Sequence, residues 1–199
     1  MLGPPPKGYL YHVFLNHDWG KDEFGRDNHR TLILIYNALL KHGVLCWFDE
    51  ARMEGQIVKK MTEGIDQSFL VLAFITKNYL EKVNSDNAND NCQIEFGYFL
   101  FHCLFSSYLL SVLILLIHCS PFFVLSRYAQ RQKSAAKMLA VPMEPRCMNP
   151  NSWKGQVGAI LGGDLYHANF AFDIEKDPAK FDAEILKLVQ RIKVLVDRA

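Results

Sequence analysis

The sequence lacks the short motifs by which most α/β enzymes are recognised. It has no G-x-x-x-x-G-K-S/T phosphate loop, no G-x-G-x-x-G after its first apolar stretch, no H-E-x-x-H and no G-x-S-x-G. Its five cysteines include no C-x-x-C pair, so the sequence predicts neither a zinc site nor a disulfide framework. Among the ordinary α/β enzymes, the chain therefore offers little.

The sequence also lacks an excess of charge. The 199 residues have a formal net charge of +1, so nothing global indicates nucleic acid or an acidic membrane surface as a partner. Residues 1–8 are rich in proline and glycine, which predicts a disordered lead-in, and they lack the apolar core of a secretory signal. The odd cysteine count favours a reducing compartment, and we expect a cytoplasmic protein.

Apolar stretches alternate with helical patterns along most of the chain. The stretches that predict strands are residues 10–15, 44–48, 69–75 and 138–143, with a short edge strand at 170–174. Apolar residues recur at helical spacing in five places. These are after Asp27-Asn28, over residues 57–66, from near Asp90, from near residue 128 and, most clearly, after Asp177-Pro178. This alternation predicts an α/β domain, a doubly wound parallel sheet of about five strands with helices on both faces.

A charged loop follows the second expected strand, where a parallel sheet binds its ligands. It begins after Trp47-Phe48 and contains Asp49, Glu50, Arg52, Met53, Glu54 and Gly55. Gly55 can adopt a positive φ where the loop turns into the next helix. From these residues alone, an ordinary strand-to-helix connection remains open.

No Asp, Glu, Lys or Arg occurs between Phe96 and Ser126. The run at residues 99–125 exceeds the length of about 20 apolar residues that a membrane-spanning helix needs. A second reading is an apolar helical insertion packed on the domain or on a partner. A third is a translated intron, because removal of residues 98–127 joins Gly97 to Tyr128 and restores an unbroken helix. The three readings stay open.

Several pieces of the sequence, taken in order, resemble a Toll/interleukin-1 receptor (TIR) domain of the kind found in microbial eukaryotes. They are HVFLNHDW at 12–19, WFDEARMEGQI at 47–57, GIDQS at 64–68, ITKNY at 75–79, DNCQIEF at 90–96 and AVPMEP at 140–145. The resemblance implies a flavodoxin-like domain over residues 9–198, interrupted by the insertion at 98–127. It also implies intracellular signalling, with other TIR domains as partners, a homo-oligomer when active and docking through the 49–57 loop. A membrane is expected only if 99–125 is a genuine span.

Many TIR domains cleave NAD at the nicotinamide–ribose bond, and the resemblance implies a site for that reaction here. Cys92-Gln93-Ile94-Glu95 matches the family's Cys-x-x-Glu, which makes Glu95 the expected catalytic carboxylate. A carboxylate against the ribose can stabilise its developing positive charge. We expect substrate contacts from Asn16, Trp47, Asp49 and Cys92, with NAD as substrate and without a cofactor or metal.

The sequence departs from the family at the end of its first strand. Asn16 and His17 stand where the family often has Ser-Tyr. Many TIR domains are adaptors without measurable enzyme activity, so a non-enzymatic TIR adaptor, which associates through the 49–57 loop, is the alternative function.

Overall fold

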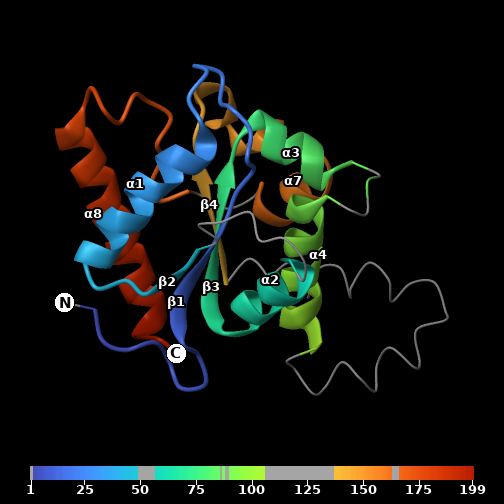
Figure 1. Ribbon diagram of the computed structural model, residues 1–199, viewed down its shortest axis with the longest axis vertical. Helices are drawn as coiled ribbons and strands as arrows, with labels where there is room; N and C mark the ends of the chain where they lie inside the picture. Colours follow the sequence, from blue (N-terminus) through green and yellow to red (C-terminus); the bar gives the residue numbers. More distant parts are fainter. Residues whose placement is uncertain (1, 49–56, 86, 88–89, 106–136, 163–165) are drawn as a thin grey trace.

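The fold is built on a parallel sheet of four strands in the order β2-β1-β3-β4. The computed structural model describes residues 2–48, 57–85, 87, 90–105, 137–162 and 166–199. The strands are β1 (Tyr11–Asn16), β2 (Cys46–Trp47), β3 (Ser68–Ile75) and β4 (Met138–Pro142). All four carboxyl ends therefore lie at the same edge of the sheet, the upper edge in Figure 1.

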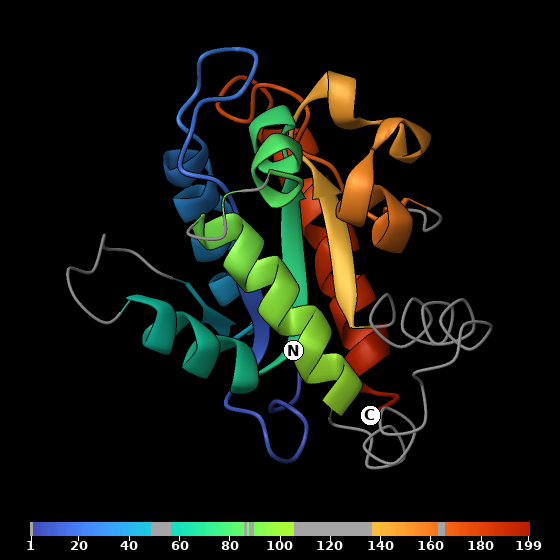
Figure 2. The same cartoon turned by 90° about the vertical axis from the view of Figure 1, so that its right-hand side faces the viewer.

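Helices cover both faces of the sheet, as the alternation predicts. One face carries α1 (Asn28–Lys41) and α8 (Pro178–Val196). The other carries α2 (Ile57–Asp66), α3 (Lys77–Val83), α4 (Asn91–Phe105) and α7 (Gly155–Leu161), as Figures 1 and 2 show. Two short 3₁₀ turns, Pro145–Cys147 and Pro150–Ser152, join β4 to α7. The expected fold class, a doubly wound α/β sheet, is confirmed.

Alternate residues of each strand enter different cores, because successive side chains point to opposite faces. Val13 and Leu15 of β1 pack with α1 and α8, whereas Phe14 packs on the side of α2, α3 and α4. Every residue of β3 is buried, which explains its run of apolar residues without alternation. Side chains at even positions of β1 therefore face the side of the sheet that carries α4.

Side chains cap the helices whose starts the sequence predicts. The Asp27 carboxylate accepts the Arg30 N–H at α1, and Asp177 accepts the Lys180 N–H at α8. The α3 helix starts in the same way at Thr76, whose hydroxyl oxygen accepts the Tyr79 N–H at 2.9 Å. These caps place the starts of α1 and α3 at the carboxyl edge of the sheet.

Residues 170–174 form no strand, so the short edge strand expected there is wrong. The segment reaches the end of β4 through one backbone hydrogen bond, from Phe170 N–H to the Pro142 carbonyl at 2.8 Å. Phe170 and Ile174 are buried in the core beside α8. Burial of these two side chains accounts for the apolar pattern without continued strand pairing.

The N-terminal residues 2–8 contain neither helix nor strand, and they lie along the core. Leu2 packs against the cluster beneath α1 and α8, and His12 Nε2 lies 3.0 Å from the Gly3 carbonyl oxygen. The buried imidazole also accepts the Leu45 N–H through Nδ1 at 2.9 Å. His12 thus joins the lead-in to β1 and the start of β2.

Helix α4 continues into the expected insertion as far as Phe105. The rest of the apolar run, and the helix expected near residue 128, lie outside the described residues. Within the described ranges, no helix is long and apolar enough to cross a membrane.

Candidate functional site

Asp18 joins three elements at the carboxyl edge of the sheet. Its fully buried carboxylate accepts the Asn28 side-chain amide of α1 at 3.0 and 3.1 Å and the Gly20 N–H at 2.9 Å. It also accepts the hydroxyl of Thr76, the cap of α3. Since a buried carboxylate needs such donors, this one network fixes the end of β1 against the starts of α1 and α3.

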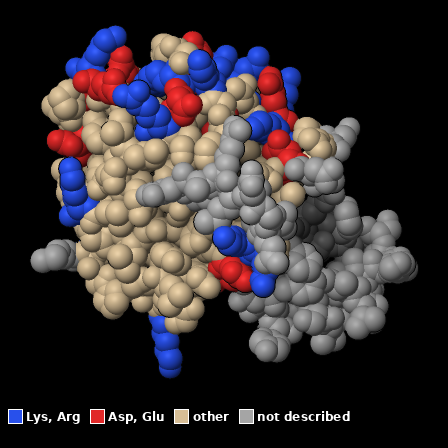
Figure 3. Space-filling model, viewed as in Figure 1, with Lys and Arg blue, Asp and Glu red and all other residues tan. Residues whose placement is uncertain are grey.

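Glu144 makes a second connection, from the end of β4. Its fully buried carboxylate accepts the backbone N–H groups of Glu23 and Lys77, each at 2.9 Å, and the Arg146 guanidinium at 2.7 and 2.8 Å. Burial alone would raise the pKa of Glu144, but the hydrogen bonds from Arg146, Lys77 and Glu23 outweigh it and lower that pKa. The charged side chains along the upper rim in Figure 3 surround this edge.

The start of α4 lies against the end of β1, and α4 is the helix that carries Glu95. The Cys92 thiol is 3.5 Å from the backbone carbonyl oxygen of His17, and the Asp90 carboxylate accepts the Cys92 N–H at 2.9 Å. Glu95 follows Cys92 by about one helical turn and is half-buried. Burial raises the pKa of both Cys92 and Tyr79, and the Glu95 charge raises both further.

Asn16 ends β1 with a buried carboxamide that is unpaired within the described part of the chain. Asn16 is 1% exposed, and neither its Oδ1 nor its Nδ2 has a hydrogen-bond partner there. It lies opposite Ala73 of β3 and, like Phe14, on the side of the sheet that carries α4. The buried hydroxyl of Tyr79 likewise has no partner among the described residues. Such buried, unpaired polar atoms are uncommon and call for a bound water or ligand.

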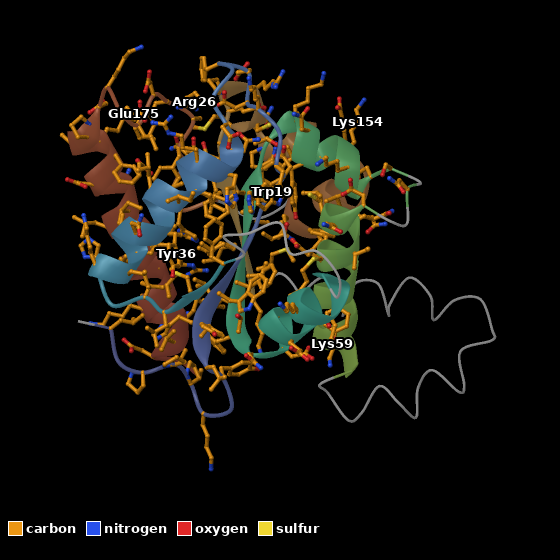
Figure 4. The ribbon with its side chains drawn as sticks, viewed as in Figure 1. Trp19, Arg26, Tyr36, Lys59, Lys154 and Glu175 are labelled. Carbon is orange, nitrogen blue, oxygen red and sulfur yellow. The ribbon has the colours of Figure 1, made fainter. Side chains whose placement is uncertain are left out.

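Aromatic and imidazole rings from β1, α1 and β2 stack at the same edge. The Trp19 ring stacks on His29 with centroids 3.8 Å apart, and His29 stacks on Phe48 at 5.1 Å. His17 Nε2 lies 3.0 Å from His29 Nδ1, and Tyr36 of α1 contacts Phe48 at 5.2 Å. Figure 4 shows Trp19 between α1 and α3. Phe48, the last described residue before the charged loop, is thus fixed by rings of two other elements.

Trp47, expected as a substrate contact, faces the α2 side of the sheet. Its ring stacks on Phe14 with centroids 4.6 Å apart and planes 9° apart. Its other neighbour is Gly64 of α2, where an added Cβ would lie 2.3 Å from the indole. The Trp47 ring is therefore packed between β1 and α2.

The expected site residues that the structure describes divide into two groups. Asn16 and Cys92 lie at the carboxyl end of β1 and Glu95 follows one turn further along α4, whereas Trp47 packs on α2. The remaining expected residues, Asp49, Glu50, Arg52, Met53, Glu54 and Gly55, lie outside the described residues.

Sequence reasoning missed Tyr79, His29 and the buried carboxylate of Asp18 as parts of this edge. Tyr79 stands within the ITKNY piece, but the sequence does not show that its hydroxyl is buried. His29 directly follows the Asp27-Asn28 cap at the start of α1. This position at the edge where the strands end could have indicated that His29 lies near the site.

The described residues of this site contain no metal centre, and the pocket described below lies elsewhere. No group of three or more His, Cys, Asp or Glu side chains could hold a metal ion within those ranges. A pocket of about 840 Å³ lies at the opposite, amino end of the sheet and is lined by Tyr9, Phe69, Lys137 and the end of α8. It is distant from Glu95 and belongs to a different part of the molecule.

Comparison with protein families accounts for this arrangement. A family model described as TIR domain matches residues 13–137, which is more than half of the chain. The chain belongs to the TIR domain family. A search of curated proteins found no match. TIR domains act in signalling and interact with other TIR domains, so the flavodoxin-like sheet and its carboxyl-edge site belong to an interaction module of that kind.

Proposed function

We propose that this TIR domain cleaves NAD at the bond between nicotinamide and ribose, with Glu95 as the essential carboxylate. The observation that carries the proposal is the placement of Glu95, half-buried and one turn from the Cys92 thiol that contacts the end of β1. The unpaired carboxamide of Asn16 lies at the same end of the strand. A carboxylate and a buried amide at one strand end suit a ligand that develops positive charge and carries hydroxyl groups.

The reaction requires little from the protein beyond electrostatics. The bond between the ribose C1′ and the nicotinamide nitrogen breaks, and its electron pair goes to the pyridinium ring, which leaves as neutral nicotinamide. The ribose becomes oxocarbenium-like, and water then adds at C1′ and releases a proton. A fixed carboxylate stabilises this positive charge more strongly in a partly buried site than in water. Glu95 fills this role without a general acid.

The remaining residues of the site have positioning or binding roles. Cys92 is no nucleophile, because burial and the Glu95 charge raise the pKa of its thiol and thus keep it protonated. The Asn16 carboxamide can donate to or accept from a ribose hydroxyl, which would satisfy both of its unpaired atoms. Asn16 is therefore the expected substrate contact at the floor of the site.

A non-enzymatic adaptor is the second candidate function, and family membership favours it. TIR domains interact with other TIR domains, and association of this domain with another needs no reaction at Glu95. In that case the 49–57 loop, not the carboxylate, would carry the function. The two candidates predict different effects of removing the Glu95 charge. The enzymatic function would be lost, whereas association through the loop would be kept.

The test is nicotinamide release from NAD by purified protein at high protein concentration. We expect release by the wild type and a loss of about 10²- to 10³-fold in the Glu95→Gln variant, which keeps the size of the side chain. The matched control is Glu81→Gln, because Glu81 is also on a helix but its side chain is 60% exposed, where it pairs with Lys77 at 3.4 Å. Absence of nicotinamide release, or equal rates in wild type and Glu95→Gln, would remove the enzymatic function and leave the adaptor.

A further inference from the structure

The pocket of about 840 Å³ at the amino end of the sheet lies opposite the edge that carries Glu95. Its lining comes from the lead-in before β1, the start of β3, the residue before β4, and the end of α8 with the residues after it. Figure 1 shows both ends of the chain near this edge. Pockets that hold small ligands have volumes of about 300–1,000 Å³, so this one is large enough for such a ligand.

An ammonium group lies over two aromatic rings in this pocket. The Tyr9 and Phe69 rings meet edge to face, with centroids 5.4 Å apart and planes 67° apart. Lys137 Nζ lies 5.3 Å from each ring centroid and donates a hydrogen bond to the Tyr9 hydroxyl oxygen at 3.0 Å. The rings attract the cation, and the hydrogen bond gives it a direction. The Lys137 ammonium therefore has a defined place at the wall of the pocket.

The same ammonium group has hydrogen bonds left to donate. Lys137 is half-buried and carries three N–H groups, of which the Tyr9 hydroxyl accepts one. No carboxylate among the described residues pairs with it, whereas Arg146 and Lys187 each pair with a buried glutamate. A partly desolvated cation without a counter-ion is unfavourable, and a bound anion would relieve this.

The rest of the pocket has a charged rim and an apolar wall. Lys7 and Arg198 are exposed at the rim, and neither forms an ion pair with a carboxylate in the part of the chain that the structure describes. Asp197 is the one acidic side chain among the described residues of the lining. Leu195 and Val196 of α8 are half-buried and supply apolar surface. An anion is therefore attracted to the pocket, and apolar surface remains for another part of the same ligand.

We propose that this pocket binds a small amphipathic anion, whose carboxylate or phosphate contacts Lys137 and whose apolar body lies against Tyr9, Phe69 and the end of α8. An inorganic anion would satisfy the ammonium group but leave the apolar wall in water. A neutral apolar molecule would cover the wall but leave the ammonium group without a counter-ion. A ligand with both parts meets both requirements. The proposal holds whether or not the domain cleaves NAD, because Glu95 lies at the other edge of the sheet.

The test is calorimetric titration of the purified protein with three probes, each at concentrations where it is monomeric. Decanoate has both the charged head and the apolar body, acetate has only the head, and decanol has only the body. We expect saturable binding of decanoate, with acetate and decanol each bound at least about tenfold more weakly, because each lacks one of the two contacts. Binding of acetate or of decanol as tight as that of decanoate would overturn the proposal.

Two variants test whether Lys137 carries the binding. Lys137→Gln removes the charge but keeps most of the side-chain length, and it should weaken the binding of decanoate about tenfold. The matched control is Lys180→Gln, because Lys180 also lies over an aromatic ring, that of Phe172 at 4.2 Å, but does not line the pocket. This control should bind decanoate as the wild type does. Unchanged affinity in Lys137→Gln, or equal losses in the two variants, would contradict the assigned contact.

A further measurement on the wild type does not depend on the folding of any variant. Intermolecular NOEs should connect the decanoate methylene protons to the ring protons of Tyr9 and Phe69 and to the methyl groups of Leu195. Absence of decanoate binding, or NOEs only to residues outside the pocket, would overturn the proposal. Sedimentation of the protein with phosphatidylglycerol vesicles, without binding of free decanoate, would overturn it as well and would assign the cations to a membrane surface.

Discussion

The indole of Trp47 lies so close to Gly64 of α2 that a Cβ on this glycine would be 2.3 Å from Trp47 Cε2. The ring cannot move away, because its stacking partner is Phe14 of the central strand, with centroids 4.6 Å apart. This contact fixes α2 against the sheet next to the charged loop, and it explains why a glycine stands within a helix.

Replacement of Gly64 by alanine should lower the free energy of unfolding. Alanine gains about 1 kcal/mol over glycine in a helix, but forced overlap in a packed core costs about 1–3 kcal/mol, so we expect a net loss of up to about 2 kcal/mol. Urea unfolding measures the change. The control is Gly97→Ala in α4, where a Cβ meets no atom of the described chain within 4 Å. This variant should be more stable than the wild type, and equal effects of the two substitutions would contradict the contact.

Replacement of Glu144 by glutamine should cost about 2 kcal/mol of unfolding free energy at neutral pH, because three donors lose a charged acceptor. The lowered pKa of Glu144 also predicts the pH dependence. The contribution of Glu144 to the free energy of unfolding is present in full above its unfolded-state pKa of about 4.3. It is lost as the pH falls through the lower folded-state pKa. Wild type should therefore lose more stability than Glu144→Gln between about pH 5 and pH 3.

Denaturant titrations at several pH values provide the measurement for Glu144. The exposed pair of Lys77 and Glu81 supplies a control, since Glu81→Gln should change stability by no more than about 0.5 kcal/mol. Parallel pH profiles for wild type and Glu144→Gln would show that the carboxylate of Glu144 does not stabilise the carboxyl edge.

Asn16→Leu should separate the stability of the fold from ligand binding. Removal of a buried amide that has no partner within the described residues should leave stability unchanged or raise it by about 1 kcal/mol. If Asn16 binds NAD, the same change should weaken binding about tenfold, the equivalent of one hydrogen bond. Calorimetric titration of NAD in a Glu95→Gln background measures this without turnover. Asn37→Leu, at an exposed position of α1, should alter neither quantity; a large loss of stability in Asn16→Leu would assign the amide a structural role.

The three described free cysteines should be unreactive in the folded protein. Cys46, Cys92 and Cys147 are buried, and burial raises the pKa of each thiol, that of Cys147 to about 12. Since only the thiolate reacts, iodoacetamide at about pH 8 should leave these residues unmodified until urea unfolds the chain. Peptide mapping by mass spectrometry reports each site separately. Rapid labelling of native Cys92 would contradict both its burial and its assigned role as a neutral contact of β1.

The sequence predicted the fold well because the apolar periodicity and the helix caps agree with each other. The Asp27 and Asp177 caps and the buried β3 stretch placed the main elements within a few residues of their observed bounds. Residues 170–174 have the same apolar pattern as a strand, yet they pack against α8. Periodicity reports burial, and it does not report whether the backbone pairs with a neighbouring strand.

The candidate site could be predicted only in part. The Cys92-x-x-Glu95 spacing and the family resemblance directed attention to α4, and the same resemblance made Asn16 an expected substrate contact, which stays a prediction. The ring cluster around His29 and the hydroxyl of Tyr79 were missed, because they depend on how α1 and α3 approach the strand ends. The spacing of residues along one helix does not contain that information.

The buried carboxylates of Asp18 and Glu144 also restrict how the molecule can respond to a ligand. They lock β1, β4, α1 and α3 into one rigid block. Helix α4 is tied to that block by the Cys92 thiol contact of 3.5 Å and by the hydrogen bond from Gln93 Nε2 to the Ser85 carbonyl at 2.7 Å, and to α2 by the Tyr98 hydroxyl and the Asp66 carboxylate at 3.1 Å. Glu95 is therefore carried by a helix that is held from both sides, so a ligand meets a carboxylate whose position is set before it binds.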